Sequence, residues 1–355
     1  MLRVTVDRGN APARTGIGVY TESLVHALRE LAADELAVAA AATSWEGSRH
    51  RPLRRLVYLW NVRREARRGF DGADVVHFTN VYVPPRRSRV GYVGTIHDLD
   101  PMMLREAHTA RYAAYFDAVA RKTAGRADVI TVDTAAVGVE VQEVLGVPAE
   151  RIAVCGNGLD RAFMETADRT PAADPPLPTL LAVGQLSRKK NIAWLVAATA
   201  RGVRTGALPR LQLRLAGGPG FGYGAIRAAL RDAGDVAEWV GSPPLAELVA
   251  LYRGCSAVVL PSLREGFGRA LLEAMYCGKP MVASRIPSSV EVAGEAALYY
   301  EPGDQEGFYA AVREVLSGAG EERRRAAARL RLEAYAWRTL IPHYVGAYTA
   351  ARPRT

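Results

Sequence analysis

Residues 262–280 read SLREGFGRALLEAMYCGKP and directly follow a short apolar run, AVVL at 257–260. The apolar run predicts a buried parallel strand, EGFG predicts a loop, and ALLEAM predicts a helix that is closed by Gly278. Glu265 would then lie in a loop at the carboxyl end of a strand, and Glu273 on the first turns of the next helix. We interpret the rest of the chain around this strand–loop–helix and its two carboxylates.

The start of the predicted helix is suited to an anion. The N–H groups of Arg269, Ala270 and Leu271 belong to its first turn, where backbone donors lack helical partners and the helix dipole is positive. The glycines before it let the backbone approach a ligand closely. A diphosphate there would have one carboxylate on each side, Glu265 for sugar hydroxyls and Glu273 for ribose hydroxyls, which is what a nucleotide sugar requires.

Glu265 and Glu273, within EGFGRALLEAM and followed by CGKP, resemble the E-x7-E signature of retaining nucleotide-sugar glycosyltransferases of family 4, which have the GT-B fold. The resemblance implies that the first glutamate contacts the transferred sugar and the second holds the ribose. A chance pair of carboxylates around an ordinary strand–loop–helix is the alternative, which the flanking GFG and G-x-P disfavour. Backbone of the intervening residues would hold sugar and phosphate: Gly266, Phe267, Gly268, Arg269, Ala270 and Leu271.

Length and composition indicate a globular protein of two domains. The 355 residues can form two hydrophobic cores, and 49% hydrophobic with 23% charged residues is not a disordered composition. The N-terminal MLRVTVDRGN has no apolar signal core, and no run reaches the ~20 apolar residues of a membrane span, so we expect a cytoplasmic protein. The net charge is +9, and most of the basic residues are arginine. This charge does not by itself indicate binding to nucleic acid.

Apolar runs alternate with helical patterns in both halves of the chain, which predicts two doubly wound, Rossmann-like α/β domains. We expect an N-terminal acceptor domain over 1–166, a proline-rich linker over 167–179 and a donor domain over 180–334. The tail 335–355 carries apolar residues at helical spacing and is expected to cross back to the first domain, as the last helix of the family does. The predicted fold is therefore GT-B, with two such domains facing across a cleft.

The predicted strands cover 2–6, 36–41, 75–78, 92–96, 129–132, 152–154, 180–183, 211–215, 236–240, 257–260, 281–284 and 297–300. The predicted helices cover 19–31, 107–123, 135–145 and 321–333, with further helices that start near 191, 223, 245, 269 and 304.

GQLSRKKN at 184–191 follows a predicted strand and opens a helix, so Lys189 and Lys190 could neutralise a diphosphate as point charges. It resembles the family's second signature, in which a basic pair before asparagine binds the phosphates of the donor. Many members carry arginine where this chain has Gln185, which puts one phosphate contact in doubt. A solvated cluster of charges at the start of a helix is the alternative.

Two motifs in the first half resemble further parts of the family's site. Gly16, in RTGIGVY, lies in a short glycine loop that in the family faces the donor's phosphates and the reacting sugar. His97, in the HDL motif after a strand, would contact the transferred sugar, with Asp98 towards the acceptor. His77 ends another predicted strand, and for this residue a place in the cleft and a place in the core are both open.

Residues 48–70 interleave arginines with apolar residues. This stretch could lie on an anionic membrane surface, or it could be an amphipathic helix that packs its apolar face on the domain.

The residues and the resemblance together predict a retaining hexosyltransferase. The donor would be a nucleotide diphosphate sugar, GDP-mannose first and a UDP-sugar second, and the acceptor a hydroxyl of a glycan, a lipid-linked glycan or a small natural product. Glu265 and His97 would orient the sugar, while Lys189, Lys190 and the helix start at Arg269 would stabilise the departing diphosphate. We expect no metal, no cofactor and no nucleic-acid partner.

Two other classes remain open. One is a different enzyme on the same fold, a nucleotide-sugar epimerase or a glycoside phosphorylase. The other is a non-catalytic, basic protein that binds a membrane or a polyanion, against which the intact Glu265, Glu273 and Lys190 count.

Overall fold

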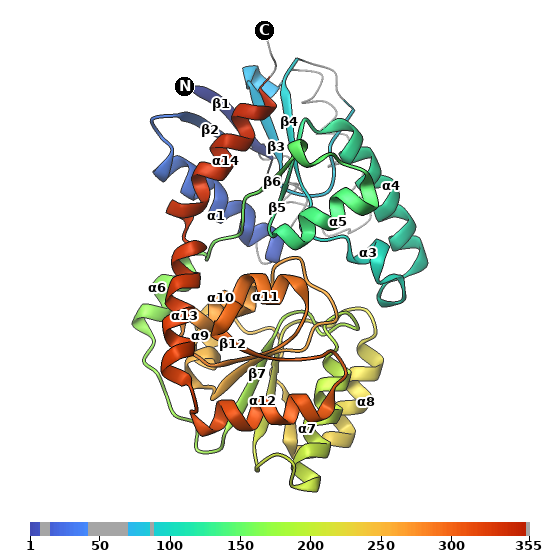
Figure 1. The fold of residues 1–355 in the computed structure, drawn as a ribbon, viewed down its shortest axis with the longest axis vertical. Coiled ribbons are helices and arrows are strands. Elements are labelled where there is room, and N and C mark those ends of the chain that lie inside the picture. Colours follow the sequence, from blue (N-terminus) through green and yellow to red (C-terminus); the bar gives the residue numbers. More distant parts are fainter. Residues whose placement is uncertain (8–14, 42–69, 86–88, 353–355) are drawn as a thin grey trace. The chain divides into compact units, whose positions relative to one another are not determined.

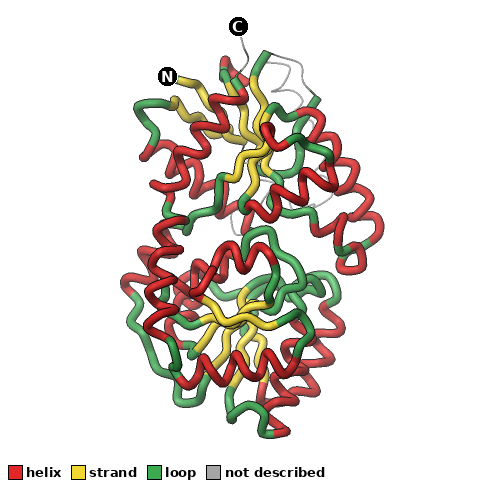
Figure 2. The backbone as a smooth tube through the Cα atoms, viewed as in Figure 1, coloured by secondary structure: helices red, strands yellow, loops and turns green. Residues whose placement is uncertain are grey.

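The computed structural model describes residues 1–7, 15–41, 70–85 and 89–352. The stretch 48–70 therefore lies outside the described residues, except for Phe70. The chain divides into two compact units. The first consists of Met1–Met102, Ala113–Asp160 and Tyr335–Thr355, and the second of Met103–Tyr112 and Arg161–Ala334. Each unit has a parallel sheet with helices packed around it (Figures 1 and 2).

The sheet of the first unit has six parallel strands in the order β2-β1-β3-β4-β5-β6. Its central strands are short runs rich in valine, threonine and small residues, as expected of strands that are buried on both faces. The bounds are β1 Leu2–Asp7, β2 Leu36–Ala41, β3 Val75–Phe78, β4 Gly91–Thr95, β5 Val129–Val132 and β6 Ile152–Val154. The helices are α1 Gly16–Leu31, α3 Asp100–Met103, α4 Ala110–Arg126, α5 Ala135–Leu145 and α14 Trp337–Ala351.

The two faces of this sheet are covered by different helices. Val76 and Phe78 of β3 share a buried cluster with Phe116 of α4 and Val137 of α5. Successive side chains of a strand point to opposite faces, so His77 between them points the other way. Its Nδ1 lies 2.9 Å from Tyr348 Oη of α14. Helix α14, drawn in red, thus packs on the first unit (Figure 1), which confirms the prediction for the tail.

The C-terminal end of α14 closely approaches β4. A Cβ added at Gly91 would lie 2.1 Å from the carbonyl oxygen of Ala351, so backbone would have to move to admit it. We expect Gly91→Ala to destabilise the protein by about 2 kcal/mol and to lower its melting temperature. The matched control is Gly125→Ala in α4, where the added Cβ meets no atom within 4 Å and alanine favours the helix. Differential scanning calorimetry that finds both variants as stable as the unaltered protein would contradict this close approach.

The second unit repeats the architecture, with strand order β12-β11-β10-β7-β8-β9. Leu180, Leu213, Val259 and Val282, one from each of the four central strands, are buried in one cluster with Leu195 of α7. The strands are β7 Thr179–Val183, β8 Gln212–Ala216, β9 Ala237–Trp239, β10 Ala257–Leu260, β11 Met281–Ser284 and β12 Ala297–Tyr300. The helices are α6 Arg161–Arg169, α7 Ile192–Thr205, α8 Tyr223–Ala233, α9 Leu245–Gly254, α10 Arg269–Tyr276, α11 Pro287–Ala293, α12 Gln305–Ser317 and α13 Glu321–Ala334.

Several helices depart from the sequence expectation: α3 was not predicted, and α4 begins and ends three residues later than predicted. Helix α1 begins at Gly16 rather than at residue 19, because Thr15 caps it: Thr15 Oγ1 accepts a hydrogen bond from the Gly18 N–H at 3.2 Å. Helix α6 (Arg161–Arg169) extends into the predicted linker and groups with the second unit, where Phe163 packs edge-on against Tyr252 of α9. Helix α11 (Pro287–Ala293) was not predicted, since its sequence PSSVEVA is short and polar at its start.

Within the described ranges, no helix is long and apolar enough to cross a membrane. Cys155, Cys255 and Cys277 are buried free thiols.

Candidate active site

In the second unit, the loops after β7 and β10 bring Lys190 and Glu265 together. These two strands are neighbours and parallel, so their carboxyl ends lie at the same edge of the sheet. Lys190 Nζ forms an ion pair with Glu265 Oε1, and Ser262 Oγ donates to the same oxygen at 2.6 Å. The Leu263 N–H donates to the Lys189 carbonyl oxygen at 2.9 Å and links the two loops through backbone. The lysine-pair motif and the E-x7-E motif, which were predicted separately, therefore form one cluster.

This cluster is largely withdrawn from water. The side chains of Lys190 and Glu265 are 18% and 7% exposed. Burial alone would raise the pKa of Glu265, but Lys190 and Lys189, with the hydrogen bond from Ser262, lower it below its ordinary value. Glu265 is therefore a carboxylate at neutral pH. A fixed anion and a fixed cation at the end of two strands can bind hydroxyls and a phosphate side by side.

The backbone conformation of both loops depends on residues that tolerate positive φ. Asn191 has φ +53° at the N-cap of α7, a left-handed conformation that asparagine adopts more readily than most residues. Gly268 has φ +88° at the N-cap of α10, and an added Cβ would lie 3.3 Å from both Leu260 and Leu271 side chains. The left-handed backbone at these two positions explains why asparagine follows the lysine pair and why glycine precedes α10.

Glu273 lies in α10 with both carboxylate oxygens engaged. Tyr252 Oη of α9 donates to Glu273 Oε2 at 2.6 Å, and Arg269 Nη2 lies 3.5 Å from Oε1. Burial, together with the carboxylate of Glu273, raises the pKa of Tyr252 well above its usual range, so the phenol keeps the proton that it donates. Glu273 itself is 9% exposed, and its carboxylate is therefore held in one orientation.

The first turn of α10 differs in one respect from the sequence expectation. The Leu271 N–H donates to the Gly268 carbonyl oxygen at 2.8 Å, so it does not project from the helix start as predicted. The Leu271 side chain is fully buried, Gly266, Phe267 and Ala270 are buried, and Arg269 is partly exposed. The amide of Leu271 is thus a structural group of the turn.

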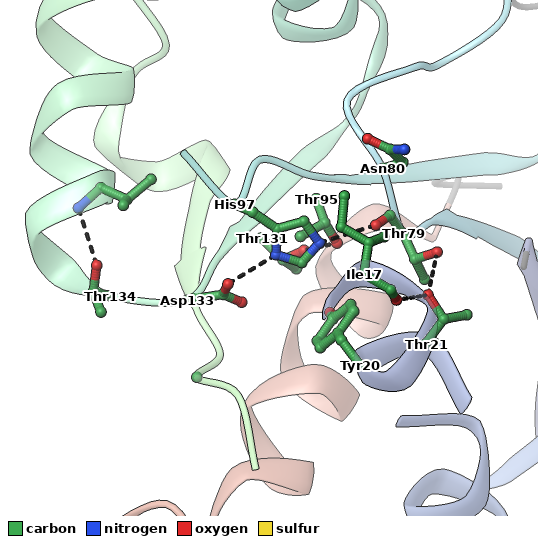
Figure 3. Close-up of polar contacts among 12 residues, drawn as sticks. Ile17, Tyr20, Thr21, Thr79, Asn80, Thr95, His97, Thr131, Asp133 and Thr134 are labelled. Atoms are coloured by element: carbon green, nitrogen blue, oxygen red, sulfur yellow. Dashed lines mark hydrogen bonds and ion pairs between the residues drawn. The ribbon is translucent and has the colours of Figure 1, made fainter. Parts of the chain in front are cut away.

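In the first unit, His97 follows β4 and its ring lies between two acceptor atoms (Figure 3). Nδ1 is 2.8 Å from Asp133 Oδ2, and Nε2 is 3.1 Å from the carbonyl oxygen of Thr79. The ring of Tyr20 meets the imidazole edge-on, with 4.8 Å between centroids. Burial alone would lower the pKa of His97, but Asp133, the Thr79 carbonyl and Asp98 together raise it above its ordinary value.

The other predicted residues of this unit have different surroundings. Asp98 Oδ1 accepts from the Asp100 N–H at 3.2 Å, which places this carboxylate at the start of α3 (Asp100–Met103). Gly16 is exposed in the first turn of α1 rather than in a loop. His77 is in the core: it is fully buried, Nε2 lies 2.7 Å from Thr95 Oγ1, and burial with the nearby His97 lowers its pKa to about 3. The cleft position left open for His77 is wrong.

Sequence reasoning missed the groups that hold the predicted residues in place. Ser262 holds Glu265, Tyr252 holds Glu273, and Asp133 with the Thr79 carbonyl holds His97. Only Asp133 carried a signal, because it directly follows β5, the parallel neighbour of β4. The described residues contain no group of three His, Cys, Asp or Glu side chains that could hold a metal ion.

Two family models match the chain in succession. One described as "Glycosyltransferase Family 4" matches residues 14–163, and one described as "Glycosyl transferases group 1" matches residues 177–318. The first match covers much of the first unit and the second covers the sheet of the second unit.

Two relatives are similar over much of the chain. Glycogen synthase of Mycobacterium tuberculosis is 35% identical over 218 residues, which cover 60% of this chain and 52% of that protein. O-antigen chain mannosyltransferase B of Escherichia coli is 29% identical over 266 residues, which cover 69% of this chain and 66% of that protein. The chain thus spans about half the length of the first relative and about two thirds of the second.

Among solved structures, Anabaena HepE in complex with UDP and glucose has a TM-score of 0.69 to this chain, with 14% sequence identity. The superposition covers 98% of this chain and 100% of that one. At such low identity, the likeness concerns the fold of the two proteins.

Proposed function

Because this chain belongs to the family 4 glycosyltransferases and has their GT-B fold, as predicted, we propose that it is a retaining hexosyltransferase with a nucleotide diphosphate sugar as its donor. The observation that carries this proposal is the buried ion pair of Lys190 and Glu265 at the carboxyl ends of β7 and β10. This ion pair joins a cation that can bind phosphate and an anion that can bind hydroxyls, one from the lysine-pair motif and one from the E-x7-E motif.

The roles of the donor-binding residues follow from their charges. Lys190 and Lys189 contact the diphosphate, and the Glu265 carboxylate, oriented by Ser262 and Lys190, accepts hydrogen bonds from the hydroxyls of the transferred sugar. As the bond between the anomeric carbon and the diphosphate breaks, the two lysines stabilise the negative charge of the leaving group. The acceptor hydroxyl bonds to the same carbon from the face that the diphosphate leaves, and its proton passes to the departing diphosphate oxygen.

Glu273 accepts hydrogen bonds from the ribose hydroxyls in this proposal. Tyr252 occupies Oε2, so Oε1, which lies 3.5 Å from Arg269, is the oxygen that faces the ribose. A carboxylate held by a buried phenol needs no reorganisation when the ribose binds, and such preorganisation favours affinity.

We propose GDP-mannose as the first donor to test and UDP-sugars as the second. The mannosyltransferase relative supports mannose, and the fold shared with HepE, whose complex holds UDP and glucose, supports a uridine nucleotide. The proposed acceptor is a hydroxyl of a glycan, a lipid-linked glycan or a small natural product. Two lysines at the diphosphate would supply the positive charge that a metal ion supplies elsewhere, so we propose a reaction without a metal.

A thermal-shift panel with GDP, UDP, ADP and TDP, each with and without EDTA, tests the donor site. A ligand that binds only the folded protein raises its melting temperature. At a ligand concentration of 100 times the dissociation constant, the free energy of unfolding increases by about 2.7 kcal/mol. We expect one nucleotide to raise the melting temperature and EDTA to leave that shift unchanged. No shift with any nucleotide would contradict the proposal, and a shift that EDTA removes would contradict metal independence.

A transfer assay with the matching nucleotide sugar tests the reaction. NMR of the product should show the anomeric configuration of the donor, because the acceptor attacks on the leaving-group face. An inverted product would contradict the retaining mechanism, and nucleotide release that needs no acceptor would favour an epimerase.

A further inference from the structure

The surroundings of His97 decide its protonation state. Nδ1 faces the carboxylate of Asp133 and Nε2 faces the backbone carbonyl of Thr79, at 2.8 and 3.1 Å (Figure 3). A carbonyl oxygen and a carboxylate only accept hydrogen bonds. A neutral imidazole has one N–H and one lone pair, so it would turn the lone pair towards one of the two oxygens. Only the imidazolium, which donates from both nitrogens, satisfies both contacts.

We propose that Asp133 is a positioning residue that holds His97 as an imidazolium, so that this side chain presents a fixed positive charge to the anionic donor. The inference rests on the proposed function and on the prediction from the sequence that His97 contacts the transferred sugar. Both N–H groups of the ring are occupied by Asp133 and Thr79, so what the ring adds to donor binding is its charge rather than a new hydrogen bond.

The carboxylate of Asp133 is suited to this role by its burial. Its side chain is 4% exposed, whereas that of His97 is 17% exposed, so the carboxylate lies behind the ring and the ring reaches the surface. Among the described residues, Asp133 Oδ1 has no hydrogen-bond partner, whereas Oδ2 contacts His97. The ring of His97 is therefore the group that compensates this buried charge. A buried carboxylate without a cation would be costly, which further favours the charged ring.

The other titratable groups around the ring do not replace Asp133. Asp98, the next residue in the chain, adds a weaker attraction for the proton. His77 is neutral in the core, and Tyr20 meets the ring with its edge and keeps its phenolic proton, because burial raises its pKa far above the ordinary value. Removal of the Asp133 charge should therefore move the titration of His97 to lower pH.

NMR of histidine-labelled full-length protein measures this state directly, with His97→Gln to assign the signals. In the unaltered protein, we expect both ring nitrogens of His97 to carry protons at pH 6.5 to 7.5, and the neutral His77 to serve as an internal reference. In Asp133→Asn, the His97 midpoint should move to lower pH. Asp117→Asn in α4, which removes a carboxylate paired with Arg121, should leave it unchanged. A lone pair on either ring nitrogen of His97 in the unaltered protein, or an unchanged midpoint in Asp133→Asn, would overturn the inference.

Donor kinetics give the second readout. Asp133→Asn should raise the KM for the nucleotide sugar about tenfold at a pH where NMR finds the ring charged in the unaltered protein and neutral in the variant, and the difference should largely disappear at a pH low enough to charge the ring in both. A KM ratio that is the same at both pH values would overturn the charge role. The NMR result does not need an active enzyme, so a charged His97 without transfer from any donor would contradict the proposed function and leave the protonation state of His97 established. The NMR measurement on the unaltered protein also decides the question if Asp133→Asn fails to fold.

Discussion

Glu265→Gln is expected to lower the rate of sugar transfer about 100- to 1,000-fold while the fold remains intact. Glutamine keeps the size of the side chain but removes the charge, the ion pair with Lys190 and one strong acceptor for the hydroxyls of the sugar. These contacts matter most as charge develops on the sugar and on the diphosphate, so the loss should fall on kcat more than on KM. Steady-state kinetics with the nucleotide sugar identified by the thermal-shift panel measure both constants.

The control for this variant is Glu301→Gln. Glu301 is a carboxylate of the same unit, 65% exposed, and its ion pair with Arg285 is on the surface. Its removal should leave kcat and KM unchanged, because exposed ion pairs contribute little. Transfer by Glu265→Gln within threefold of the unaltered enzyme would remove Glu265 from the active site.

Lys190→Ala is expected to destabilise the protein by about 3 kcal/mol and to lower its melting temperature by roughly 10 °C. The change leaves the buried Glu265 carboxylate with the hydroxyl of Ser262 and the more distant Lys189, but without its ion pair. The double variant Lys190→Ala with Glu265→Gln should recover most of the lost stability, because it removes the uncompensated charge. Lys279→Ala, a partly exposed lysine of the same unit, is the control and should melt as the unaltered protein does.

The pH dependence of this effect has a definite sign. In the folded protein, the pKa of Glu265 is below its ordinary value of 4.5, so ionisation of this group stabilises the fold above that value. This contribution is lost as pH falls through the lowered pKa. The stability difference between the unaltered protein and Lys190→Ala should thus be largest at neutral pH and shrink in acid. A difference that grows as pH falls would contradict the assigned charge state.

Much of the fold could be predicted because its signals are local. The short, mostly apolar runs of β3, β5, β10, β11 and β12 are followed by polar residues or proline, and their predicted ranges agree with the structure residue by residue. Helix α11 escaped prediction because its stability comes from packing rather than from a periodic apolar face, as its buried Ser288 and Ser289 show. Helix α1 was predicted too short, since two glycines near its start favour a loop in isolation.

Only those residues of the candidate site that belong to recognisable sequence motifs could be predicted. Glu265, Glu273, Lys190 and His97 belong to such motifs, but apart from Ser262 and Arg269 their partners come from parts of the chain that are distant in sequence. No pattern in the sequence joins Tyr252 to Glu273, 21 positions away in the chain, because their contact is made by the packing of α9 and α10. The pairing of Lys190 with Glu265, 75 positions apart, likewise depends on β7 and β10 being neighbours.

Helix α14 has a consequence for when the first unit can complete its interior during synthesis. The six strands of the first unit lie between residues 2 and 154. In its interior, however, His77 is hydrogen-bonded to Tyr348, and Tyr20 to Tyr344, both of α14. A ribosome releases these tyrosines only after every strand of the second unit has emerged. Part of the interior of the first unit therefore stays uncovered until the second unit has been synthesised.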